Sequence, residues 1–80
     1  MRHHARVITT ETLRALTRVR GLAKSGEARR IREASSLSLS EVAAAVGVGV
    51  STLARWELGD RRPQGEAALR YLGILDELAP

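Results

Sequence analysis

The sequence predicts an all-α fold, a small bundle of about five helices, and three observations lead to it. Apolar residues recur at spacings of three and four in several segments, which is typical of helices with one buried face. Glycines stand where several of these segments stop. Residues 38–59, SLSEVAAAVGVGVSTLARWELG, contain two short helical patterns joined by a turn with glycines. The 80 residues suffice for one small domain.

The first expected helix spans about residues 10–24. Thr9 or Thr10 can cap its start, and the Ser25-Gly26 pair ends it. Its apolar stripe consists of Leu13, Leu16, Val19 and Leu22, and its outer side carries Arg14, Arg18 and Arg20. A lone helix of about fifteen residues is marginal in water, so the stripe must be buried. We expect it to dock on the last helix; a second subunit is the alternative, and the helix could also lie along DNA.

A short helix over residues 27–34 follows, with Ala28 and Ile31 facing inward. The next helix begins at Ser38, which forms a capping box with Glu41 three residues on. Its apolar positions are Val42, Ala43 and Val46.

Gly47 ends that helix, and a second one runs from about Val50 to Leu58. The small Ala43 lets two helices cross closely, and Leu53 lies where it can pack back on the preceding helix. This spacing predicts a helix-turn-helix motif. The alternative is a plain helical pair in a small bundle.

After Gly59, a loop with Arg61 and Arg62 on its outside leads to Pro63 and a last helix at about 64–78. We expect Leu69 and Leu72 of this helix to close the core, with Leu75 as a third candidate. Tyr71, Ile74 or Leu78 would be left for a contact between two subunits.

Composition excludes several classes of function. No cysteine is present, which excludes disulfides and thiolate metal sites. No apolar run approaches the ~18 residues of a membrane span, and the N-terminus lacks the apolar stretch of a secretory signal. His3 and His4 are adjacent without spaced partners, so they predict an exposed tail and no metal site. GVGVS (47–51) lacks the lysine of a phosphate-binding loop. We therefore expect a soluble cytoplasmic protein that is not an enzyme and needs no cofactor.

The positive charge is concentrated in the N-terminal half. Residues 1–36 hold nine Arg and Lys against three Glu, a net +6. Residues 37–80 hold four Arg against six acidic residues, a net −2. A basic arm that includes Arg2 and Arg6 suits a polyanion, because neutralised phosphates release counterions. A solvated charged face is the alternative.

Residues 31–75 resemble the helix-turn-helix domain of the Cro and phage-repressor (XRE) type, which has the lambda-repressor-like fold. The resemblance rests on three pieces, IREASSLSLSEVA, AVGVGVSTLARWELG and RRPQGEAALRYL. It divides the chain into a basic arm with an amphipathic helix, 1–25, and a helix-turn-helix domain, 26–80. It implies that helix 50–58 lies in the major groove of double-stranded DNA.

By the same resemblance, base readout falls to Val50, Ser51, Thr52 and Arg55. Phosphate contacts fall to Ser38, Leu39, Gly49, Arg61 and Arg62. Position 49 is usually Ser or Thr in this family, so Gly49 contributes no capping side chain here. The resemblance also implies a structural ion pair between Arg32 and Glu57, because a guanidinium can hold a carboxylate by two bonds.

These features predict a sequence-specific transcriptional regulator, a repressor that acts as a homodimer at the nucleoid. Two alternatives within DNA binding are an excisionase-like accessory factor of a phage or mobile element and an antitoxin-type repressor. Their second partner would be a recombinase or a toxin. The alternative from another class is a protein-interaction module with the same fold, which the acidic 37–80 segment keeps open.

Overall fold

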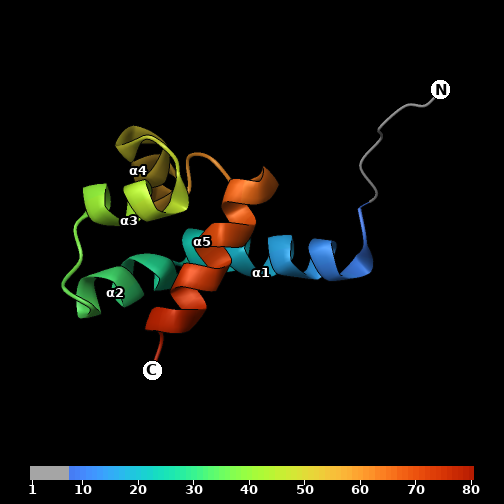
Figure 1. The fold of residues 1–80 in the computed structure, drawn as a ribbon, viewed down its shortest axis with the longest axis horizontal. Helices are drawn as coiled ribbons and strands as arrows, with labels where there is room; N and C mark the ends of the chain where they lie inside the picture. The colour runs from blue at the N-terminus through green and yellow to red at the C-terminus, as the bar shows by residue number, and fades with distance from the viewer. Residues whose placement is uncertain (1–7) are drawn as a thin grey trace.

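A computed structural model describes residues 8–80 of the chain, and these residues form helices but no strands. In chain order the helices are α1 (Thr10–Ser25), α2 (Glu27–Ala34), α3 (Leu39–Val46), α4 (Val50–Leu58) and α5 (Gly65–Leu78). The predicted all-α bundle is confirmed. Figure 1 shows α5 crossing α1, with α3 and α4 above them. The predictions for Arg2, Arg6, His3 and His4 lie outside the described residues.

Short-range signals determine where the helices begin and end. Thr9 caps α1, and its hydroxyl oxygen accepts a hydrogen bond from the Thr12 amide at 3.1 Å. Ser38 and Glu41 form the predicted capping box at the start of α3, with bonds of 2.9 and 3.0 Å. Hydrogen bonds from Ser38 lower the pKa of the Glu41 carboxyl. Gly47 ends α3 in the left-handed region, at φ 88°, which a side chain would disfavour.

The core draws buried apolar residues from all five helices. It consists of Val19, Ala28, Ile31, Val42, Ala43, Val46, Leu53, Trp56, Ala68, Tyr71 and Leu75. Helix α1 packs on α5 and also contacts α2 and α4. The docking of α1 on the last helix is therefore as expected. Because Val19 lies in the shared core, α1 folds as part of the same bundle as the helix-turn-helix.

Two expectations about the core are wrong. Tyr71 was one of three candidates to remain free for a second subunit, but it is 1% exposed and its ring lies 5.3 Å from that of Trp56. Leu69 was expected in the core and is 36% exposed. The buried residues of α5 are Ala68, Tyr71 and Leu75, so Leu75 is buried as expected, while Ala68 and Tyr71 stand one position before the expected Leu69 and Leu72. Both sets of positions are apolar, so helical periodicity did not distinguish them.

Other side chains also differ from the expected arrangement. Leu13 was placed on the buried stripe of α1, but it is 54% exposed. Figure 1 shows that the N-terminal part of α1 extends beyond α5. Ile74 and Leu78 pack partly on the core and are not left over. Arg20 was expected on the outer side, yet its Nε donates to the Pro63 carbonyl at 2.8 Å.

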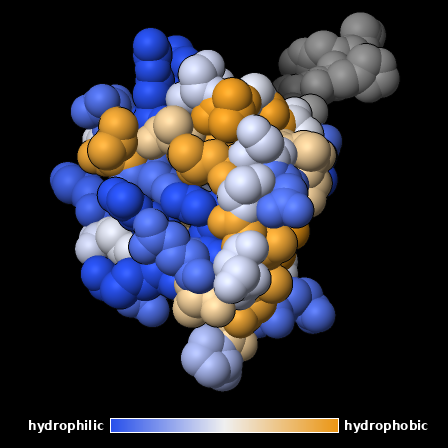
Figure 2. Space-filling view, turned by 90° about the vertical axis from the view of Figure 1, so that its left-hand side faces the viewer, coloured by the Kyte–Doolittle hydropathy of each residue, from blue (hydrophilic) through white to orange (hydrophobic). Residues whose placement is uncertain are grey.

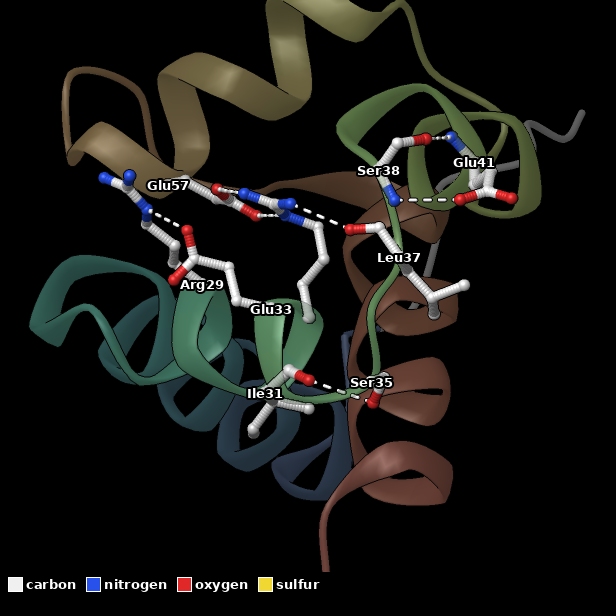
Figure 3. A network of polar contacts seen from close by, with 9 residues as sticks. Arg29, Ile31, Glu33, Ser35, Leu37, Ser38, Glu41 and Glu57 are labelled. Atoms are coloured by element: carbon white, nitrogen blue, oxygen red, sulfur yellow. Dashed lines mark hydrogen bonds and ion pairs between the residues drawn. The ribbon is translucent and has the colours of Figure 1, made fainter.

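One ion pair joins α2 to α4. The Arg32 Nε donates to one Glu57 carboxylate oxygen at 2.6 Å, and an Nη donates to the other at 2.9 Å (Figure 3). The second Nη donates to the Leu37 carbonyl at 2.9 Å. The two side chains are 11% and 5% exposed. The bond to Glu57 raises the pKa of Arg32, so the pair stays ionised.

We predict that Arg32→Ala and Glu57→Ala each lower the free energy of unfolding by about 3–5 kcal/mol, because each leaves its partner buried without a counter-charge. The double variant should lose clearly less than the sum of the two, as measured by chemical denaturation. The exposed Arg29–Glu33 pair of α2, at 3.0 Å, is the matched control and should contribute about 0.3–0.5 kcal/mol. Strictly additive losses at Arg32 and Glu57 would contradict the pair.

The Tyr71 hydroxyl is a buried polar group without a hydrogen-bond partner among residues 8–80. Burial raises the pKa of this phenol well above its usual range, so the group stays neutral. The ring stabilises the core through its contact with Trp56, whereas burying the unpaired hydroxyl costs desolvation free energy.

We predict that Tyr71→Phe leaves the free energy of unfolding unchanged or raises it by about 1 kcal/mol, because it removes an unpaired hydroxyl and keeps the ring. Tyr71→Ala, which removes the ring as well, should cost about 3–5 kcal/mol. Thermal and chemical unfolding measure both changes. A loss of about 1 kcal/mol in Tyr71→Phe would mean that the hydroxyl has a bonded partner.

Candidate nucleic-acid interface

The turn between α3 and α4 sets the angle at which α4 is held. The amides of Gly47 and Val48 both donate to the Ala43 carbonyl, at 2.8 and 3.1 Å. Arg70 of α5 reaches the same place, where its Nε donates to the Val46 carbonyl at 2.8 Å. The left-handed backbone at Gly47, with φ 88°, is what favours glycine here, and a Cβ would also lie 3.2 Å from an Arg70 Nη, which would have to shift by a few tenths of an ångström. The role of Arg70 was not predicted.

Helix α4 buries one side and presents the other to solvent. Leu53 and Trp56 are 0% and 3% exposed and anchor it to the core. Of the predicted base-reading residues, Val50, Ser51 and Arg55 are exposed, and Thr52 is half-buried at the edge of the outer face. Leu58, which is not among the predicted base-reading residues, is 68% exposed on the same helix.

The expected phosphate contacts occupy different surroundings. Arg61 and Arg62 are exposed in the loop after α4, where the Asp60 and Arg61 amides donate to the Arg55 carbonyl at 3.0 and 3.4 Å. Gly49 caps α4 without a side chain, which leaves the amides at the helix start to other acceptors.

Ser38 and Leu39 stand at the start of α3 and are less open to a phosphate. The Ser38 amide donates to the Glu41 carboxylate at 2.9 Å, so this group is already occupied. That carboxylate also sets a negative charge beside the helix start. Leu39 is half-buried and packs on the core.

Ion pairs divide the basic side chains into two groups. Arg18 pairs with Asp76 at 2.6 Å, and Arg29, Arg30 and Arg32 also have carboxylate partners. Among residues 8–80, seven others have no carboxylate partner: Arg14, Arg20, Lys24, Arg55, Arg61, Arg62 and Arg70. Arg20 and Arg70 donate to backbone carbonyls instead. Three of the other five lie on α4 and the loop after it, so unpaired positive charge gathers there although residues 37–80 are net acidic.

The end of the molecule formed by α2, α3 and α4 carries apolar side chains among charged ones (Figure 2). A hollow of about 190 Å³ opens between these helices, and its apolar lining is Leu39, Ala54 and Leu58. No three His, Cys, Asp or Glu side chains within residues 8–80 come together as metal ligands would. None of the described helices has the length and apolar character needed to cross a membrane.

The comparisons with known proteins agree with this geometry. A family model described as helix-turn-helix matches residues 29–78, which include α3, the turn, α4 and α5. No curated protein and no solved structure matches the chain. The family match covers more than half of the 80 residues. The chain therefore belongs to the Cro/C1-type helix-turn-helix (XRE) family, a family of DNA-binding domains.

Proposed function

We propose that the protein is a sequence-specific transcriptional repressor that binds double-stranded DNA as a homodimer at the nucleoid, with α4 in the major groove. One observation carries the proposal. The single acidic residue of α4, Glu57, is 5% exposed and paired with Arg32, so Arg55 provides the only charge on the outer face of the helix. A groove lined by phosphates favours that arrangement.

The chemistry of each side chain on α4 and the loop after it suggests which part of the DNA it would contact. Arg55 would hold a guanine through two hydrogen bonds, and Val50 would contact a thymine methyl group. Ser51 and Thr52 would donate to or accept from base edges. Arg61 and Arg62 would bind phosphates and set the register, with smaller contributions from Ser38, Leu39 and the amides after Gly49.

A homodimer would read two half-sites. Tyr71, Ile74 and Leu78 serve the core of their own chain, so they are poor candidates for its interface. The apolar side chains that remain exposed on α1 and α5 are Leu13, at 54%, and Leu69, at 36%. These two are the better candidates.

Selection of bound sites from random duplex DNA tests the function. We expect an enriched motif with two related half-sites, as a two-fold dimer requires. A selection with Arg55→Ala, run in parallel, should lose preference at a guanine of the motif. Failure of the unaltered protein to enrich any sequence would contradict the proposal.

A protein-interaction module is the second candidate, and the apolar edge of α4 favours it. Leu58 and Val50 are 68% and 46% exposed, and Leu58 borders the hollow with Leu39. A toxin or recombinase could dock there. Salt dependence separates the two functions, because DNA binding weakens steeply with salt whatever the sequence, whereas an apolar contact does not.

We predict different effects for two arginines. Arg55→Ala should cost about 1–3 kcal/mol on the preferred site and relax the preference at one base pair. Arg61→Ala should weaken binding to all sequences alike and flatten the dependence of affinity on salt. Titrations of the selected site and of a scrambled duplex at several salt concentrations measure both. Uniform weakening by Arg55→Ala would contradict this division of roles.

A further inference from the structure

A basic hollow of about 240 Å³ lies where the second half of α1 meets the end of α4 and the loop after it. Its apolar floor includes Ala23, Trp56 and Pro63. Its rim carries four basic side chains, two from α1 and two from the loop: Arg20, Lys24, Arg61 and Arg62. No acidic residue lines it.

The two sides of the hollow are tied together. The Arg20 Nε donates to the carbonyl of Pro63, a residue whose side chain is fully buried. The stem of Lys24 lies against Gly59, where an added Cβ would stand 3.9 Å from the Lys24 Cγ. Helix α1 and the loop are therefore held in one arrangement, and the Arg20 guanidinium keeps its remaining N–H donors.

The charge of the hollow is uncompensated. Lys24, Arg61 and Arg62 have no carboxylate partner within residues 8–80, although Arg18 on the same helix pairs with Asp76. Like charges held close together repel, and only an anion between them relieves the repulsion. The donors offered, guanidinium and ammonium groups, are those that bind phosphate.

We propose that this hollow is a phosphate-binding site and that a DNA backbone phosphate next to the one held by the loop occupies it. The choice of DNA as the source rests on the proposed function, because Arg61 and Arg62 belong both to the hollow and to the loop after α4. Arg20 and Lys24 lie outside the residues matched by the family model, 29–78, so α1 adds a contact of its own to the interface.

The test compares Lys24→Gln with Arg14→Gln. Both substitutions remove one positive charge from an exposed side chain of α1 that has no carboxylate partner within residues 8–80. Arg14 lies about 15 Å along the helix axis from Lys24 and does not line the hollow. The glutamine at position 24 keeps most of the stem against Gly59.

For a short duplex of random sequence, we expect Lys24→Gln to weaken binding and to reduce the slope of log affinity against log salt by about 0.9, the value of one phosphate contact. Arg14→Gln should leave the slope unchanged. Equal slopes in the two variants, or no change in Lys24→Gln, would overturn the proposal.

Inorganic pyrophosphate separates the site from the proposed function. If the unaltered protein binds no duplex, the proposed function fails. The phosphate site is then tested by itself: the melting temperature is measured in pyrophosphate and in sodium chloride of equal ionic strength. A melting temperature raised by pyrophosphate in the unaltered protein, and much less in Lys24→Gln, would support a phosphate site that takes a free phosphate. The same shift in both, or none, would overturn it.

Discussion

The ion pair between Arg32 and Glu57 is the interaction on which the rest of the structure depends. It joins α2 to α4 through two hydrogen bonds, and the third arm of the guanidinium holds the Leu37 carbonyl just before α3. One side chain thus ties three parts of the helix-turn-helix together (Figure 3). Because the pair is largely buried, removing either partner would strand the other charge. The same pair turns the only carboxylate of α4 inward and leaves Arg55 alone on the outer face.

Net charge along the chain is a poor guide to where this protein is positive. The N-terminal 36 residues are net +6, but Arg18, Arg29, Arg30 and Arg32 are already paired with carboxylates. The C-terminal part is net −2, yet its exposed loop holds two arginines without carboxylate partners among the described residues. The electrostatic field that a polyanion meets comes from the arginines and lysines that have no carboxylate partner. Most of these exposed side chains lie on α4, on the loop after it and at Lys24.

Local signals in the sequence predicted most of the fold, because helix ends depend on residues three or four apart. The capping box at Ser38 and the left-handed glycine at Gly47 are of this kind. The docking of α1 followed from its need to bury an apolar stripe. The Arg32–Glu57 pair, 25 positions apart, was expected only from the family resemblance. Two other contacts between distant residues had no such signal: Arg70 meets Val46 and Arg20 meets Pro63 across 24 and 43 positions. The exact face of α5 also escaped prediction, because both neighbouring sets of positions are apolar and the contact of Tyr71 with Trp56 has no signal in helical periodicity.

The central claim is that α4 offers its outer face to DNA while the ion pair holds its inner face. The most direct test is the change in backbone amide chemical shifts when isotope-labelled protein is titrated with the selected duplex. The account predicts the largest changes at 49–52, Arg55 and 61–62, a smaller change at Lys24, and little change in the last turns of α5. Changes confined to α5, or to the apolar edge at Leu39, Ala54 and Leu58, with residues 50–55 unaffected, would contradict it.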